Sequence, residues 1–506
     1  MFLRKKNRAS TSRLKRVLIF CHMSTFFTEL FREAILLQKS NNYEPMFLFR
    51  KYPTLSNDLK ECLKENIFCI DENGTVISAM SEVNTEKKII TTEENLVSIA
   101  ILRRSFTSKN VGLLPSFIKK PLKFVFLRLA KNVKTIFASD ALTLIHELKE
   151  LKKKYVAIFK IYQPHLLLLA GDQVGNDTPF LIKVAHNFGV AAIITPSTMT
   201  NGLEEREVYS KNPRHYLNNS ANRLAGFLFP SWVIKYKGRK LIRVPGARVF
   251  AFEWLGVSPP APWTFHSGFA DCIAVESNAM LDYYLKAGLP SEKLKLTGSP
   301  VYDSLAQFMQ NKAQLREKLY ERMDLKMGKP LIVSALPPDS LYMVGGRPEC
   351  DFQKYDELVE FWLKSLGSIR GYNVVISLHP SVDFDSSKHL EKFGVRIAKE
   401  NIVHLIPLCD IFVASVSSTI RWAIACGKPV LNYDIYRYKY TDFNEVPGVL
   451  RVEEQTDFLK TLEQLAYDKK YYSDTAYAQA ACSGYWGCLD GKAGNRILEL
   501  IEKFEK

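Results

Sequence analysis

The stretch LIPLCDIFVASVSSTIRWAIACGKPVL, Leu405 to Leu431, decides the fold that we expect for the second half of the chain. Its apolar residues Ile411 to Val413 predict a short buried strand, and the following residues predict a helix that ends at Gly427, before Pro429. Backbone N–H groups are free at a helix N-terminus and the dipole is positive there, so the turn between strand and helix is a candidate anion site. The alternative is an ordinary N-cap. The turn carries the hydroxyl side chains of Ser415, Ser417, Ser418 and Thr419.

Strands and helices alternate along most of the remaining chain. RVLIFCHMSTFFTELFREAILLQKS (16–40) predicts a strand, a loop with His22, and an amphipathic helix. PHLLLLAGDQ (164–173) and NVVISLHP (373–380) each predict a buried strand followed by a polar loop. This alternation predicts an α/β fold with two Rossmann-like, doubly wound parallel sheets, which bind ligands at the carboxyl ends of their strands.

A chain of 506 residues is too long for a single core. We expect an N-terminal Rossmann-like domain over 14–310, a C-terminal Rossmann-like domain over 311–485, and a C-terminal helix within 486–506. Residues 206–265 interrupt the first domain with a segment rich in Lys, Arg and aromatic side chains.

The overall composition narrows the class of protein. The chain has 69 Lys and Arg against 53 Asp and Glu, a net charge of +16, which favours an anionic partner. Nine Cys without a CxxC pair favour a reducing compartment and no zinc site. No run of about 18 apolar residues predicts a membrane span, so we expect a cytoplasmic protein. No nucleic-acid motif accompanies the basic charge, so no nucleic-acid partner is expected.

Two segments, 119–134 and 206–265, combine basic with apolar or aromatic residues. Such a combination suits an anionic membrane surface and predicts a peripheral location at the inner face of the membrane. The alternative is a basic insertion that covers the domain and pairs with acidic neighbours.

His379 and Pro380 directly follow an apolar strand. Proline ends a strand and favours an extended residue before it, so we expect the imidazole at the carboxyl end of this strand. Histidine can donate to a phosphate or exchange a proton near neutral pH. A local hydrogen-bonding role is the alternative, but the hydroxyl turn follows after one intervening strand, so both groups are expected to converge on one anion.

Three motifs, in this order and spacing, resemble the C-terminal half of a GT-B-fold protein: GLPSEKLKLTGSPVYDSL (288–305), VVISLHP (374–380) and DIFVASVSSTIRWAIACGKPVL (410–431). PHLLLLAGDQ is similar to a strand end in the N-terminal half of UDP-N-acetylglucosamine 2-epimerase-like proteins. The groups concerned are UDP-N-acetylglucosamine 2-epimerase-like proteins, CDP-glycerol glycerophosphotransferases, and bacterial transferases with HP and Ser-Ser/Thr motifs. The resemblance implies two facing Rossmann-like domains, with a nucleotide-activated sugar held mainly by the C-terminal one.

The resemblance also implies a donor site that needs no metal or other cofactor, because helix termini and side chains can neutralise phosphate charge. Glu276, which follows a buried strand, and Arg421 are further candidates for donor contact. The donor- and phosphate-binding residues implied are Gly298, Ser299, His379, Pro380, Ser415, Ser417, Ser418 and Thr419.

The sequence departs from the epimerases in the helix after the turn. Epimerases carry an acidic pair there, one carboxylate of which holds the ribose, whereas this chain has Arg421 and Trp422. Their Ser-Gly-Gly turn is here Val416-Ser417-Ser418. These differences argue against UDP-sugar epimerisation, and the Ser-Ser-Thr version is more similar to transferases with CMP- or CDP-activated donors.

A transferase needs a base that deprotonates the acceptor hydroxyl, or a group that stabilises the oxyanion. Four candidates lie at predicted strand ends or loops of the N-terminal domain, and Asp172 is the first of them because it ends a buried strand. Its alternative role is a loop carboxylate that caps the following helix. The four are Asp172, Glu204, Glu205 and His22.

We therefore expect a metal-independent glycosyltransferase that moves a sugar or sugar acid from a CMP-, CDP- or UDP-linked donor. The expected acceptor is a surface polysaccharide, of the capsule or lipopolysaccharide kind, or a lipid-linked glycan. A nucleotide-sugar 2-epimerase or hydrolase is the alternative enzyme, and it would turn over the donor without an acceptor. A non-catalytic GT-B protein that binds glycan or nucleotide is the third hypothesis.

Overall fold

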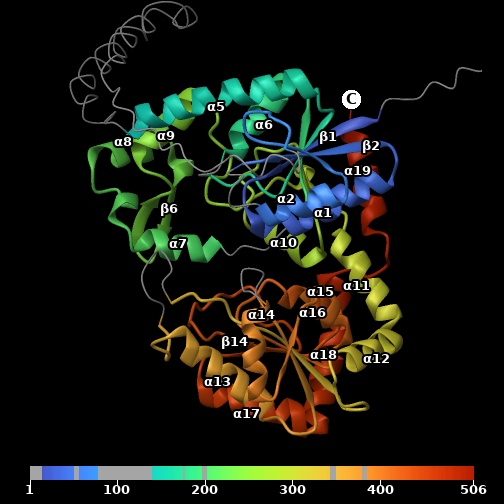
Figure 1. Ribbon diagram of the computed structural model, residues 1–506. Helices are drawn as coiled ribbons and strands as arrows, with labels where there is room; N and C mark the ends of the chain where they lie inside the picture. The colour runs from blue at the N-terminus through green and yellow to red at the C-terminus, as the bar shows by residue number, and fades with distance from the viewer. Residues whose placement is uncertain are drawn as a thin grey trace, which may run out of the picture.

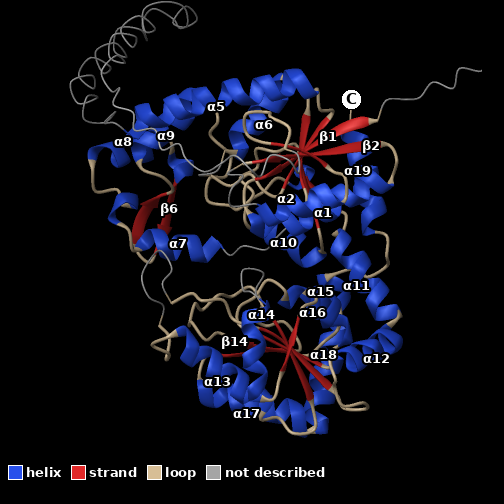
Figure 2. Cartoon of the chain, viewed as in Figure 1, coloured by secondary structure: helices blue, strands red, loops and turns tan. Residues whose placement is uncertain are grey.

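The computed structural model describes residues 14–50, 56–77, 140–174, 177–196, 202–341, 349–378 and 384–505. Within these residues the chain forms two α/β units, one above the other in Figure 1. Figure 2 shows the strands at the centre of each unit, with helices packed around them.

The first unit is built on a parallel sheet with the strand order β3-β2-β1-β4-β5-β8-β9. Its strands are β1 (Lys15–Cys21), β2 (Tyr43–Phe49), β3 (Phe68–Ile70), β4 (Leu166–Leu169), β5 (Ala191–Ile194), β8 (Cys272–Val275) and β9 (Leu294–Leu296). Its helices are α1 (Ser24–Lys39), α2 (Ser56–Lys64), α5 (Asp140–Tyr162), α6 (Thr178–Asn187), α10 (Asn278–Lys286) and the 3₁₀ turn η5 (Ser291–Lys293).

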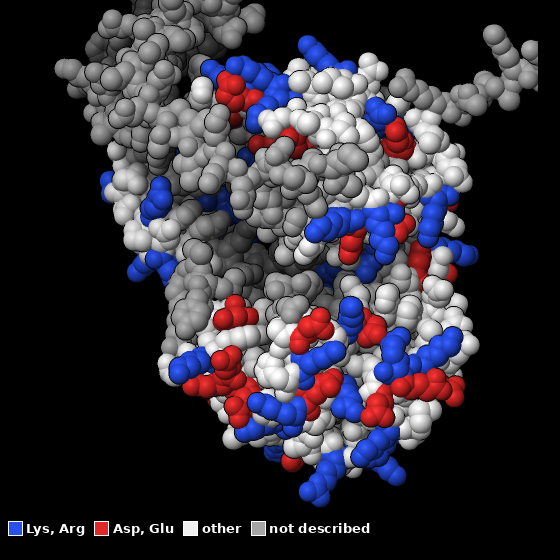
Figure 3. Space-filling model, viewed as in Figure 1, with Lys and Arg blue, Asp and Glu red and all other residues white. Residues whose placement is uncertain are grey.

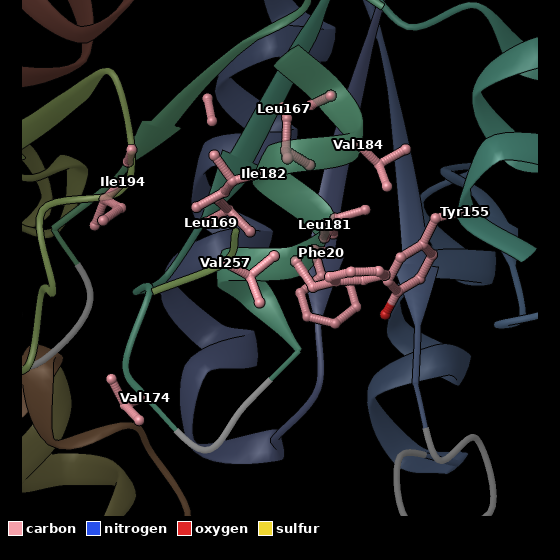
Figure 4. Packing of buried hydrophobic residues seen from close by; sticks show 14 of the residues in the cluster. Phe20, Tyr155, Leu167, Leu169, Val174, Leu181, Ile182, Val184, Ile194 and Val257 are labelled. Atoms are coloured by element: carbon pink, nitrogen blue, oxygen red, sulfur yellow. The ribbon is translucent and has the colours of Figure 1, made fainter. Parts of the chain in front are cut away.

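Strand β4 lies inside this sheet and is buried on both faces. Leu167 and Leu169 join one apolar cluster, with Phe20 and Tyr155 (Figure 4). Leu166 and Leu168 join a second cluster on the opposite face of the sheet. Because side chains alternate between faces, a parallel strand covered on both sides needs an unbroken apolar run, which is what the sequence LLLL provides.

The basic segment between β5 and β8 folds as a separate layer on the first unit. Strands β6 and β7 pair antiparallel and belong to neither main sheet. Lys237 and Gly238 form their turn with φ of +44° and +78°, the left-handed pair that a tight hairpin favours. The elements are α7 (Gly202–Ser210), η3 (Pro213–His215), α8 (Ser220–Leu228), η4 (Pro230–Trp232), β6 (Val233–Tyr236), β7 (Arg239–Ile242) and α9 (Gly246–Leu255).

The second unit has the parallel strand order β12-β11-β10-β13-β14-β15, the same left-to-right pattern as the first six strands of the other sheet. Its strands are β10 (Leu331–Ala335), β11 (Asn373–Ser377), β12 (Arg396–Ala398), β13 (Ile411–Ala414), β14 (Val430–Tyr433) and β15 (Val449–Val452). Its helical segments are α13 (Tyr355–Gly367), α14 (Phe384–Ser387), η6 (Lys388–Phe393), α15 (Ile402–Leu405), η7 (Ile406–Leu408), α16 (Ile420–Ala425) and α17 (Gln455–Tyr467). Two doubly wound parallel sheets, the fold class expected from the sequence, are thereby confirmed.

Four helices connect the units along one side of the molecule (Figure 1). They are α11 (Pro300–Gln310), α12 (Lys312–Arg322), α18 (Lys469–Trp486) and α19 (Ala493–Phe504). Tyr302 of α11 packs in an apolar cluster of the second unit, whereas Ile497 and Ile501 of α19 pack in a cluster of the first. The chain therefore passes from the first unit to the second and returns. Among the described helices, none combines the length and the apolar character that crossing a membrane requires.

Asp303 of α11 fixes the start of the returning helix. Its Oδ1 accepts the Ala493 N–H at 2.9 Å, and its Oδ2 accepts the Gly494 N–H at 2.8 Å. A carboxylate at this position satisfies free donors and complements the helix dipole.

We expect Asp303→Ala to reduce the free energy of unfolding by about 1–2 kcal/mol, because the first turn of α19 loses its acceptor. Urea unfolding measures this loss, and hydrogen exchange should locate it in 493–504. The matched control is Asp385→Ala, an exposed carboxylate in α14. An Asp303 variant as stable as this control would contradict the capping role.

Candidate functional site

The hydroxyl turn lies at the carboxyl end of β13, as the sequence predicts. Val416 adopts a φ of +49°, and its N–H donates to Asn432 Oδ1 at 2.9 Å. The Ser417 and Thr419 hydroxyl oxygens are 2.8 Å apart, and the Thr419 N–H donates to Ser417 Oγ at 3.3 Å. The predicted phosphate residues Ser415, Ser417, Ser418 and Thr419 thus form one compact turn that leads into α16.

The helix after the turn also matches its sequence signals. Helix α16 ends at Ala425, and Gly427 follows with a φ of +63°. A left-handed residue after the last turn is the usual place for glycine. His379 and Pro380, the other predicted phosphate ligands, lie outside the described residues. Their strand, β11, is separated from β13 by β10.

An ion pair joins the two units at the carboxyl ends of their sheets. Glu276 directly follows β8 of the first sheet, and Arg421 lies in the first turn of α16 in the second unit. Arg421 Nε is 2.9 Å from Glu276 Oε1, with side-chain exposures of 3% and 6%. The guanidinium also lies 5.4 Å from the centroid of the Trp422 ring. Two predicted donor-contact residues are therefore brought together between the units.

Several polar atoms around this pair are buried without a hydrogen-bond partner in the described part of the chain. They include Nη1 of Arg421 and Nε1 of Trp422, whereas Arg421 Nε and Glu276 Oε1 contact each other at 2.9 Å without the geometry of a hydrogen bond. Ser415 Oγ of the hydroxyl turn is also buried without a hydrogen-bond partner among the described residues. Buried polar groups are normally satisfied, and exceptions are most informative where they gather at one place. Here they gather between the carboxyl ends of two parallel sheets, where such folds bind ligands.

Helix α1 adds two buried carboxylates that sequence reasoning missed. Glu29 and Glu33 are 6% and 0% exposed, and both oxygens of Glu33 have no hydrogen-bond partner among the described residues. The charge of Glu29 acts on Glu276: burial raises the pKa of Glu276, Arg421 opposes this shift, and Glu29 adds to it. The sequence contained a signal, because Glu33 falls on the apolar stripe of α1 between Leu30 and Leu37.

Asp172, the first candidate for the base, is fully buried. Its Oδ1 accepts the Ser267 N–H, and its Oδ2 accepts the N–H groups of Phe269 at 2.7 Å and Ala270 at 3.1 Å. Burial raises its pKa, and these hydrogen bonds oppose the shift. The carboxylate therefore anchors the loop before β8 rather than capping α6, whose N-cap residue is Asp177.

The other predicted site residues are dispersed over the first unit. His22 follows β1 and lies between the rings of Phe20 and Phe26, with centroids 5.5 and 5.4 Å away. Glu204 and Glu205 belong to α7, but their side chains lie outside the described residues.

The predicted donor residues Gly298 and Ser299 lie at the end of β9 and are covered by α19. Gly298 has a φ of +83°, and a Cβ there would be 2.8 Å from the Ala493 Cβ. Within the described residues, no cluster of three or more His, Cys, Asp or Glu side chains could hold a metal ion.

We expect Glu33→Gln to change the pH dependence of stability. Burial, and then the charges of Glu29 and Asp303, raise the pKa of Glu33 to about 8. Because this folded-state pKa lies above that of the unfolded chain, the stability from the protonated form is full below about pH 4.5 and is lost as pH rises through about 8. Each pH unit within that window changes the free energy of unfolding by at most about 1.4 kcal/mol.

Thermal unfolding between pH 5.5 and 8.5 measures this effect. The Tm of the unsubstituted protein should fall more steeply with pH than that of Glu33→Gln, and Glu317→Gln, an exposed site on α12, should follow the unsubstituted protein. If Tm changed with pH equally in the unsubstituted protein and in Glu33→Gln, Glu33 would be ionised in the folded protein.

We expect Arg421→Met to reduce the free energy of unfolding by about 3–5 kcal/mol, because it leaves Glu276 as a buried, unpaired charge. Adding Glu276→Gln should restore much of the loss, since both charges are then absent. Urea unfolding of the two single variants and the double variant forms a double-mutant cycle. Additive losses would mean that the two side chains do not interact.

Comparisons with known proteins show a likeness of fold. No family model matches the chain. No curated protein matches its sequence either. Solved structures do match, among them the UDP-GlcNAc 2-epimerase of Neisseria meningitidis bound to UDP-GlcNAc, at 13% identity and a TM-score of 0.48, over 97% of this chain and 100% of that one.

Two further structures have similar scores. A variant of the wall teichoic acid polymerase TagF has 13% identity and a TM-score of 0.49, over 97% of this chain and 88% of that one. A glycosyltransferase from Rickettsia africae has 12% identity and a TM-score of 0.45, over 98% and 100%. At these identities and TM-scores the likeness says nothing about the reaction of this chain.

Proposed function

We propose that this protein is a glycosyltransferase that moves a sugar or sugar acid from a nucleotide-activated donor to a glycan acceptor. One observation supports this most: the Glu276–Arg421 pair holds the carboxyl ends of two parallel sheets against each other. Each Rossmann-like sheet binds ligands at that end, so the seam between the units can take a donor from one side and an acceptor from the other.

The second unit takes the donor in this proposal. The turn at 415–419 combines a left-handed residue, hydroxyl groups and the start of α16, a combination suited to a phosphate. His379 is the proposed second phosphate ligand, from the strand β11. Arg421 supplies positive charge close to the turn, so phosphate binding does not require a metal.

The first unit supplies the acceptor side. Both oxygens of Asp172 already accept backbone N–H groups. His22, at the end of β1, and Glu204 and Glu205, in α7, therefore become the stronger candidates for the base. Glu276 lies at the junction itself and is the proposed donor contact of the first unit.

A lipid-linked or surface-polysaccharide acceptor fits the basic layer formed by 206–265. This layer has ten Lys and Arg but only two Glu and no Asp. Phe227 of α8 and Trp254 of α9 are 82% and 64% exposed. Figure 3 shows Lys and Arg over the flank that carries α8 and the β6–β7 hairpin. Exposed aromatic and basic side chains suit an anionic membrane surface, so the proposal includes a peripheral location at the inner face of a membrane.

We expect a cytidine or uridine nucleotide to raise the Tm of the protein in a screen of CMP, CDP, UDP and GDP. His379→Ala and Ser418→Ala should weaken this binding far more than they lower stability, because they remove the proposed phosphate ligands. Thermal shift with each nucleotide measures the first effect, and urea unfolding without nucleotide measures the second. Equal nucleotide affinity in the well-folded variants would contradict the phosphate site.

Product analysis with the matching sugar nucleotide separates the classes of protein. Transfer that depends on an added glycan supports the glycosyltransferase. Donor turnover without an acceptor supports an epimerase or hydrolase. Nucleotide binding with no turnover under either condition supports a non-catalytic binding protein.

A further inference from the structure

We propose that the amino-terminal edge of the second sheet holds a second anion site, which binds a phosphoryl group through Lys312, Lys428 and the N-terminus of α12. This site is separate from the hydroxyl turn. Lys428 comes just before β14, and its neighbour Asp410 comes just before β13, whereas the hydroxyl turn follows the other end of β13. The two sites therefore lie at opposite ends of the strands of the same sheet.

One carboxylate faces three cations at this edge. Asp410 accepts two hydrogen bonds from Arg316, at 3.0 and 2.6 Å, and a third from the Leu331 N–H at 2.8 Å. Lys312 Nζ is 3.9 Å from Asp410 Oδ1. The parallel register of β13 and β14 puts Lys428 beside Asp410 as well. One negative charge therefore serves the three positive charges of Arg316, Lys312 and Lys428, and the group has a net charge of +2.

Lys428 is the unusual member of this group. It is only 6% exposed, and no ion pair is formed by it among the described residues. Its ammonium group interacts with that of Lys312: burial, and then Lys428, lower the pKa of Lys312 to about 8. A buried ammonium beside another ammonium is costly unless negative charge is nearby. Asp410 supplies one negative charge for three cations, and a bound anion supplies the remainder.

The start of α12 adds a second electropositive feature. Lys312 is the first residue of this eleven-residue helix. Its N-cap, Asn311, makes no side-chain hydrogen bond to the helix, and the first turn contains no acidic residue. The free N–H groups and the positive end of the helix dipole are therefore at the same end of α12 as Lys312. Helices ordinarily carry carboxylates, not ammonium groups, in their first turn.

The chemistry of the site favours a phosphoryl group. Two kinds of donor are present: the ammonium groups of two lysines and the N–H groups of a helix N-terminus. A phosphoryl group offers three strong acceptor oxygens and up to two negative charges, so it satisfies all of them together. The source of this group is either free phosphate or a phosphomonoester.

The test is a titration of the full-length protein with inorganic phosphate at constant ionic strength, with chloride as the replaced anion. Thermal unfolding and isothermal titration are followed in parallel. We expect phosphate to raise the Tm, and we expect Lys312→Met with Lys428→Met to weaken the binding by about tenfold or more, since charge-assisted hydrogen bonds are lost. In chloride alone this double variant should be at least as stable as the unsubstituted protein, because the repulsion is removed while the apolar stems remain.

Two controls separate this site from others. Lys318→Met removes an exposed cation from the same helix and should leave the phosphate response unchanged. Ser417→Ala with Ser418→Ala alters the hydroxyl turn and should preserve the response of the lysine site, so a failure of the donor-site proposal is distinguishable. Should Lys428→Met fold poorly, Lys312→Gln alone is measured.

Glycerol 3-phosphate in place of inorganic phosphate distinguishes the two sources: tighter binding of the ester indicates a phosphomonoester, and tighter binding of phosphate indicates the free anion. The proposal is overturned if the lysine variants respond to phosphate as the unsubstituted protein does. It is also overturned if the unsubstituted protein responds to phosphate no more than to chloride.

Discussion

The buried pair of Glu276 and Arg421 is the contact on which the arrangement of the two units depends. It joins the residue after β8 to the helix after β13, so it fixes the carboxyl ends of the two sheets opposite each other. Two charges removed from water are rarely retained for stability alone, because desolvation offsets most of their attraction. The unmet hydrogen bonds of Arg421 increase that cost. The pair is better explained as a positioning device at a site than as a stabilising contact.

The connecting helices complement this pair at the side of the molecule. Helix α11 packs with the second unit and α19 with the first, and Asp303 joins the two helices through the N-terminus of α19. The hydrogen bonds between Asp303 and the start of α19 therefore hold the units together on one side of the molecule. The buried ion pair of Glu276 and Arg421 holds them together where their sheets face each other. Glu33, on α1, lies near the first of these contacts, where the charge of Asp303 reaches it. Protonation of this one carboxylate thus affects the region through which the two units are connected.

Local sequence patterns were sufficient to predict the sheets and the hydroxyl turn. The apolar run of β4 and the glycine after α16 reflect short-range constraints, burial on both faces and a left-handed helix end, which single residues encode. The pairing of Glu276 with Arg421 is different, because the two residues are far apart in the chain and no periodicity relates them. The same holds for Asp172, whose hydrogen bonds to 267–270 depend on tertiary packing. Sequence patterns specify which end of a strand carries polar residues. They do not specify which of those residues form hydrogen bonds or ion pairs within the tertiary structure.

Helix α16 gives the second sheet a further physical property. It starts from the hydroxyl turn and ends at Ala425, three residues before Lys428, and all six of its residues are buried. At about 1.5 Å per residue this helix is about 9 Å long, so it acts as a short rigid spacer in a close-packed environment. The turn at one edge of the sheet and the lysine cluster at the other are therefore held at a fixed separation by one packed element. A chain that places net positive charge at one end of this spacer and the hydroxyl groups proposed to bind phosphate at the other presents two chemically different ends of a single sheet.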